Sequence, residues 1–133
     1  MTDDRLYELA AAARENAYAP YSGFRVGAAL ATCDGKIYTG CNIENSSYGD
    51  TCCAERVALF KAVSEGERLF GAIAVAGGRG EKPDAQCMPC GICLQALAEF
   101  CPPDFRIITA ALSGGYAAFT LKELLPRAFS LGK

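Results

Sequence analysis

Cys53-Ala54-Glu55 and Pro89-Cys90-Gly91-Ile92-Cys93 are the two stretches of this chain that decide its fold and its chemistry. Three cysteines in this pattern can hold one zinc ion through three sulfurs and leave a fourth position open for water. Glu55 would then lie where it can move protons to and from that water. The chain contains no histidine, so a Ser-His or Cys-His nucleophile pair is excluded and zinc chemistry must rest on Cys and carboxylate groups.

The spacing of the cysteines offers more than one set of ligands. Cys87-Met88-Pro89-Cys90 is a second CxxC, and Cys52 is likewise an alternative to Cys53 as a zinc ligand. A proline inside the second CxxC argues against both of its cysteines lying in one helix. Both motifs are expected to place their first cysteine near a helix N-terminus, where the partial positive charge favours thiolate. The Cys-Ala-Glu and Pro-Cys-x-x-Cys patterns therefore favour one set of zinc ligands: Cys53, Cys90 and Cys93.

Other interpretations of these residues stay open at this point. A single cysteine can be a small buried apolar residue, as we expect for Cys33 and Cys101. The zinc site could be purely structural, with Cys52 or Cys87 as a fourth ligand, or the CxxC could be a redox pair. Glu55, taken alone, could be an ordinary first-turn acid that favours the helix dipole.

Length and composition limit the class of protein. The chain has 133 residues, which predicts a single domain over residues 1–133. Apolar residues make up 51%, above the ordinary range for soluble domains, which is a hint of subunit interfaces. The formal net charge is −2 and Lys and Arg form no stripe, so a nucleic acid polymer is disfavoured as partner. A small neutral substrate fits this charge better.

The sequence also bears on where the protein works. No apolar run approaches the roughly 20 residues that cross a bilayer, so no membrane association is expected. Met1-Thr2-Asp3-Asp4 lacks a basic segment, so no signal peptide is expected. Eight cysteines without a signal peptide indicate reduced thiols or bound metal, and hence a cytoplasmic location.

Periodicity and turn signals give the expected elements. Thr2 can cap a first helix whose apolar residues continue to Ala17, before Pro20 and Gly23 end it. Asp34-Gly35 predicts a hairpin turn between the first two strands. The expected strands are 24–32, 36–42, 72–76, 105–111 and 116–119. The expected later helices are 53–65, 90–100 and one that starts at a capping box, Thr120-Leu121-Lys122-Glu123. This order predicts an α/β fold with one mixed sheet and helices on both faces.

The two cysteine motifs together resemble the zinc nucleoside deaminases, specifically the short cytidine deaminases of the three-cysteine subgroup. The resemblance runs from about Leu6 to Phe129. It implies a single-domain α/β/α sandwich with a five-stranded mixed sheet, one Zn²⁺ per subunit and a homotetramer. It further implies hydrolytic deamination of cytidine and 2′-deoxycytidine to uridine and 2′-deoxyuridine, with release of ammonia, in pyrimidine salvage.

The resemblance also assigns roles to residues. Glu55 would carry one proton to ring N3 of cytosine and a second to the departing amino group. Arg56 would bond the ligand sulfurs and offset the negative charge that three thiolates leave on Zn²⁺. Asn42 and Glu44 would hold the 3′-OH side of the sugar, and backbone groups at Ala54 would contact the base. Three further residues match aromatic positions at the pocket or at a subunit contact: Phe24, Tyr48 and Phe129.

Several points keep rival interpretations in view. The family often has Arg after the last zinc cysteine, and here that residue is Leu94. Gln86-Cys87-Met88 stands where Ser or Thr is often found nearby. Another aminopyrimidine, such as the nucleoside antibiotic blasticidin, is a rival substrate, although Asn42-Ile43-Glu44-Asn45 favours an ordinary nucleoside. A noncatalytic zinc protein or a redox-responsive thiol protein is a rival from another class.

Overall fold

One mixed sheet organises the computed structural model, which describes residues 1–132. Over these residues the strand order is β2-β1-β3-β4-β5. β3 and β4 run parallel, and every other neighbouring pair is antiparallel. The strands are β1 (Arg25–Thr32), β2 (Ile37–Cys41), β3 (Phe70–Gly78), β4 (Arg106–Ala110) and β5 (Tyr116–Thr120).

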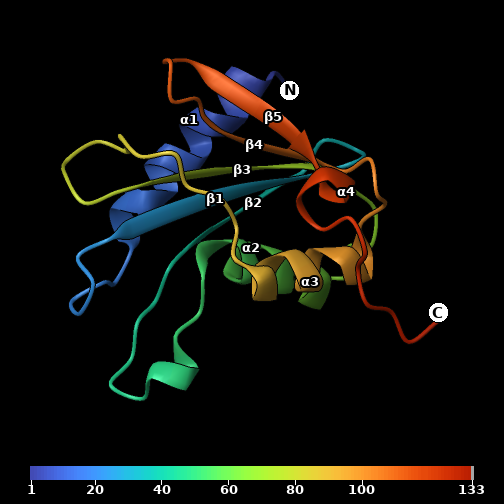
Figure 1. The fold of residues 1–133 in the computed structure, drawn as a ribbon, viewed down its shortest axis with the longest axis horizontal. Helices are drawn as coiled ribbons and strands as arrows, with labels where there is room; N and C mark the ends of the chain where they lie inside the picture. Colours follow the sequence, from blue (N-terminus) through green and yellow to red (C-terminus); the bar gives the residue numbers. More distant parts are fainter. Residues whose placement is uncertain (133) are drawn as a thin grey trace.

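Helices cover both faces of this sheet (Figure 1). Along β1 the side chains alternate, so that Ala28 and Leu30 belong to the core under α2 and α3, whereas Ala29 packs with Leu6 and Ala10 of α1. Because both faces are covered, β1 is apolar almost throughout. The predicted α/β/α sandwich with a five-stranded mixed sheet is therefore confirmed. The helices are α1 (Asp3–Ala13), α2 (Ala54–Ser64), α3 (Gly91–Phe100) and α4 (Leu121–Leu124), with 3₁₀ turns η1 (Arg14–Asn16) and η2 (Tyr48–Asp50).

Three of the sequence signals at the ends of elements are confirmed. The Thr2 side chain caps α1 by accepting from the amide of Arg5, and Thr120 forms a capping box with Glu123 at α4. Gly35 takes a positive φ of 92° in the predicted hairpin turn. None of the helices within residues 1–132 has the length and apolar character that a membrane crossing requires.

The end of the first helix was predicted wrongly. The helix stops at Ala13, because Arg14–Asn16 tightens into η1 and the chain then leaves the helix axis. The amide of Tyr18 donates to the carbonyl of Asn42, and the amide of Glu44 donates to the carbonyl of Tyr18. These bonds tie the segment after α1 to the segment after β2, which the apolar spacing of the helix could not indicate.

Gly27 in β1 allows α1 and η1 to pack directly on the sheet. A Cβ atom at this position would overlap the carbonyl oxygen of Ala10 and the backbone nitrogen of Arg14, and would lie 2.8 Å from Arg14 Cα. We expect Gly27→Ala to lower the free energy of unfolding by about 3 kcal/mol, because backbone must move to admit the methyl group. Urea unfolding would measure it, with Gly49→Ala as control because a Cβ there meets nothing within 4 Å. Equal midpoints for the two variants would contradict the packing argument.

Candidate active site

Cys90 and Cys93 converge through the capping geometry of α3. Cys90 is the N-cap residue, with extended backbone at φ −74° and ψ 171°, and Cys93 is the third helical residue. Residues at these two positions are three apart and lie on the same side of the helix, so their side chains can approach, and their Sγ atoms are 3.7 Å apart. The expectation that Cys90 is itself helical was therefore wrong by one residue. The i, i+3 spacing brings the two sulfurs together because it joins the N-cap residue to the third helical residue.

Cys53 and Arg56 repeat this relation at α2. Cys53 is the N-cap residue, and Arg56 is the third helical residue. Arg56 Nη2 donates to Cys53 Sγ at 3.6 Å and to the carbonyl of Thr51 at 3.4 Å. Two helix N-termini thus present cysteine sulfurs, and the partial positive charge of each stabilises thiolate.

The three sulfurs meet from separate segments of the chain. Cys53 Sγ lies 4.0 Å from Cys90 Sγ, and the Sγ atoms of Cys53, Cys90 and Cys93 all lie within 4.8 Å of one another. A tetrahedral zinc site with zinc–sulfur bonds of about 2.3 Å has sulfur–sulfur edges of about 3.8 Å. The donor set and its spacing therefore fit a zinc ion held by three sulfurs.

The electrostatics of the cluster also suit a cation. The pKa of Cys53 is lowered to about 5, chiefly because it accepts a hydrogen bond from Cys93 and also because Arg56 donates to it. The pKa of Cys93 is raised, first because it is the donor in that bond. The pKa of Arg56 is raised by its bonds to these sulfurs, and its buried Nε has no hydrogen-bond partner among residues 1–132. Metal binding deprotonates thiols outright, so a zinc-loaded cluster would offer this donor additional acceptors.

Glu55, the second residue of α2, lies in the wall of a cavity of about 180 Å³ beside the sulfurs. The residue is only 4% exposed, and burial raises the pKa of its carboxyl group to about 7. A carboxyl group with a pKa near neutrality can both accept and donate a proton at working pH. The same cavity is lined by Asn42, Ala54 and two of the cysteines, Cys53 and Cys90.

The side-chain amide of Asn42 forms two hydrogen bonds with the backbone. Its Oδ1 accepts from the amide of Val26 at 2.8 Å, and its Nδ2 donates to the carbonyl of Phe24 at 2.8 Å. A side-chain amide has two donor hydrogens and two acceptor lone pairs, so one of each is left for a ligand. The two backbone bonds fix the orientation of the amide where it lines the cavity.

Glu44 is held by the loop that precedes β1. Its carboxylate accepts from the amides of Tyr21 and Ser22, at 2.9 and 3.1 Å, and from the Ser22 hydroxyl. These bonds lower the pKa of Glu44, the bond to the Ser22 hydroxyl most of all, so the group is ionised at neutral pH. A carboxylate has about four acceptor sites, which leaves one for a further hydroxyl group.

The remaining residues named from the sequence lie further out. Phe24 is half-buried and rests over Gly77, beside Cys87; a Cβ at Gly77 would lie 3.0 Å from the ring. Tyr48 is 77% exposed on η2, with its ring centroid 6.1 Å from that of Tyr21. Phe129 is 68% exposed, and its carbonyl accepts from Gln95 of α3. Neither Tyr48 nor Phe129 lines the cavity of this single chain.

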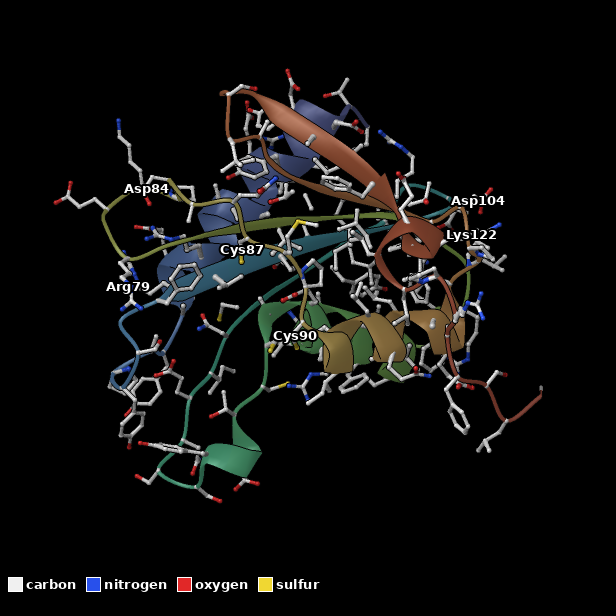
Figure 2. The ribbon with its side chains drawn as sticks, in the orientation of Figure 1. Arg79, Asp84, Cys87, Cys90, Asp104 and Lys122 are labelled. Atoms are coloured by element: carbon white, nitrogen blue, oxygen red, sulfur yellow. The ribbon has the colours of Figure 1, made fainter. Side chains whose placement is uncertain are left out.

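Some lining residues were not named as binding residues from the sequence. Val26, Thr51 and Met88 face the cavity without a motif to mark them. Cys87 also lines it, but lies outside the sulfur cluster, and burial raises the pKa of its thiol to about 12. Figure 2 shows Cys87 against the sheet and Cys90 at the beginning of α3. Leu94 of α3, where the family often has Arg, is 7% exposed and belongs to the hydrophobic core.

Three convergent sulfurs beside a buried glutamate, on an α/β/α sandwich, are the features of a zinc-dependent hydrolase. Residues 1–109 match the family described as the cytidine and deoxycytidylate deaminase zinc-binding region, and the chain belongs to this family.

Individual proteins agree with the family match. A cytidine deaminase of Halalkalibacterium halodurans is 50% identical over 130 residues, which are 98% of this chain and 96% of the relative. A cytidine deaminase of Sporosarcina psychrophila is 48% identical over 98% of this chain and 93% of its own length. The crystal structure of cytidine deaminase from Burkholderia pseudomallei superimposes with a TM-score of 0.87 at 47% identity, covering 97% of this chain and all of that one.

Proposed function

We propose that this enzyme, a member of the cytidine deaminase family, hydrolyses cytidine and 2′-deoxycytidine to uridine and 2′-deoxyuridine with release of ammonia. The observation that carries the proposal is the buried Glu55 beside three converging sulfurs in one cavity. The relatives of similar sequence that are named cytidine deaminases support the deamination of cytidine. A role in pyrimidine salvage follows from these substrates.

We propose Cys53, Cys90 and Cys93 as the zinc ligands, with one ion per subunit. When bound, zinc lowers the pKa of a coordinated water toward roughly 7. Glu55 would accept a proton from the attacking water and deliver it to ring N3, which makes C4 electrophilic. Glu55 would then carry the second proton of the water to the amino group, which leaves as ammonia. Arg56, bonded to Cys53, would offset the negative charge of three thiolates.

The sugar would lie toward Asn42 and Glu44. Asn42 offers one donor and one acceptor, and ionised Glu44 offers an acceptor, which together suit neutral hydroxyl groups. A 5′-phosphate would be repelled by the carboxylate of Glu44. This supports a nucleoside over a nucleotide, with the backbone of Ala54 against the base and Phe24 at the edge of the pocket.

We infer a homotetramer that completes the site. The cavity of about 180 Å³ is smaller than the roughly 300–1,000 Å³ usual for small-molecule sites. Phe129 and Tyr48 are exposed aromatic side chains available to a neighbouring subunit. Sedimentation is expected to give four times the mass of the chain; a monomer at working concentration would contradict this.

The location we propose is the cytoplasm. All eight cysteines are free, and three of them form the sulfur cluster. Thiol ligands stay available in a reducing compartment, whereas secreted proteins pair their cysteines.

The test of the proposed function is ammonia release, with the accompanying ultraviolet change, from cytidine and 2′-deoxycytidine by zinc-loaded protein. Blasticidin S in the same panel separates the rival aminopyrimidine. Turnover of blasticidin S alone would move the assignment to that substrate. No turnover of any of the three would favour a structural zinc site.

A further inference from the structure

Arg14 is a fully enclosed guanidinium that anchors the loop after β3. Its side chain is 0% exposed. Its acceptors are the carbonyl oxygens of Arg25, Gly78, Gly80 and Glu81 and the carboxylate of Glu15. A guanidinium has five N–H donors, so each of them has a partner. Arg14 thus fixes the loop 78–81 against the beginning of β1.

Arg79 projects from this anchored loop toward the segment before β1. Its Nη1 donates to the carbonyl of Ser22 at 2.5 Å, and its guanidinium carbon lies 5.8 Å from the centroid of the Phe24 ring. Figure 2 shows Arg79 at the end of the sheet where β1 begins. Arg79 is not among the residues that line the cavity beside the sulfurs and Glu55.

Ser22 connects Arg79 to the carboxylate that we assign to the sugar. Its amide and hydroxyl both donate to Glu44, while its carbonyl accepts from Arg79. Its hydroxyl oxygen also accepts from the amide of Phe24 at 2.9 Å. The neighbouring Gly23 has φ +70°, a left-handed conformation that glycine adopts without a steric cost.

We propose that Arg79 is a positioning residue for the sugar side of the site, acting through Ser22 and Phe24 on the placement of Glu44. The inference rests on the proposed function, because it takes the ligand of Glu44 to be a sugar hydroxyl. Arg79 acts on binding and on discrimination between sugars. The proton transfers by Glu55 do not depend on it.

The experiment compares Arg79→Met with Arg79→Lys in zinc-loaded enzyme. Methionine keeps an apolar stem without charge or donor, whereas lysine keeps both and can still lie over the ring. Arg79→Met is expected to raise KM for cytidine roughly two- to fivefold at unchanged kcat, the range of an exposed cation–π contact. The preference in kcat/KM for cytidine over 3′-deoxycytidine should shrink by a similar factor. In Arg79→Lys, KM for cytidine and this preference should both stay close to the wild-type values.

Arg68→Met is the matched control. Arg68 is also exposed and also donates to backbone carbonyls, those of Val63 and Glu67, but it lies beyond the C-terminal end of α2. Amide hydrogen exchange over 19–25 should be faster in Arg79→Met and unchanged in Arg68→Met. This second readout does not depend on turnover.

The outcomes separate the two proposals. Absence of cytidine turnover by the wild type would count against the proposed function. Normal wild-type turnover, with the same sugar preference and the same exchange over 19–25 in Arg79→Met, would overturn the role of Arg79 alone. A fall in kcat without a change in KM would overturn it as well, because the residue would then act on the chemical step.

Discussion

Replacing Glu55 with glutamine is expected to lower kcat for cytidine roughly 10²- to 10⁴-fold while the zinc content stays unchanged. Glutamine has nearly the same shape, so it can occupy the wall of the cavity where Glu55 is 4% exposed. It cannot take a proton from water or return one to the substrate. Steady-state ammonia release and metal analysis of the same preparation would measure both quantities.

The effect on stability sharpens this prediction. Burial raises the pKa of Glu55 to about 7, so the folded state holds the charged form at a cost. A neutral glutamine removes that cost, and the melting temperature of Glu55→Gln should not fall. Glu65→Gln, at the other end of α2, is the control and should retain full activity. Near-normal turnover by Glu55→Gln would remove Glu55 as the proton carrier.

The elements of the fold were predictable because each leaves a local signature. Cap residues such as Thr2 and Thr120, the turn glycine Gly35 and the alternation of side chains along β1 act over a few residues. The end of α1 was not predictable, because it depends on backbone bonds from Tyr18 to the segment after β2. Contacts between distant segments leave no local pattern in the sequence.

The candidate site also has features that the sequence predicts and features that it does not. The convergence of Cys90 and Cys93 follows from the N-cap and third position of one helix, which the spacing already contains. The hydrogen bonds of the Asn42 side chain to the backbone of Val26 and Phe24 could not be predicted from the sequence, because they form only when β1 lies beside the end of β2. Arg14 likewise looks like any charged residue at the end of a helix until the fold brings the carbonyl groups of Arg25 and of the loop 78–81 around it.

Replacing one cysteine by alanine should remove zinc only where that cysteine belongs to the cluster of three sulfurs. The zinc content should fall from about one ion per chain to almost none after dialysis in Cys53→Ala, Cys90→Ala and Cys93→Ala, because two sulfurs hold zinc far more weakly than three. Activity should be lost with the metal. Metal analysis after gel filtration, with circular dichroism to confirm folding, would measure the difference.

Cys87→Ala is the variant that decides which CxxC binds the metal, and it should retain both zinc and activity. Cys87 lines the same cavity, but its sulfur lies outside the cluster formed by Cys53, Cys90 and Cys93. Its backbone is tied to β4 instead: its amide donates to Thr109 Oγ1, and its carbonyl accepts from the same hydroxyl. Loss of zinc in Cys87→Ala, or retention in Cys93→Ala, would shift the ligand set to the CxxC that starts at Cys87.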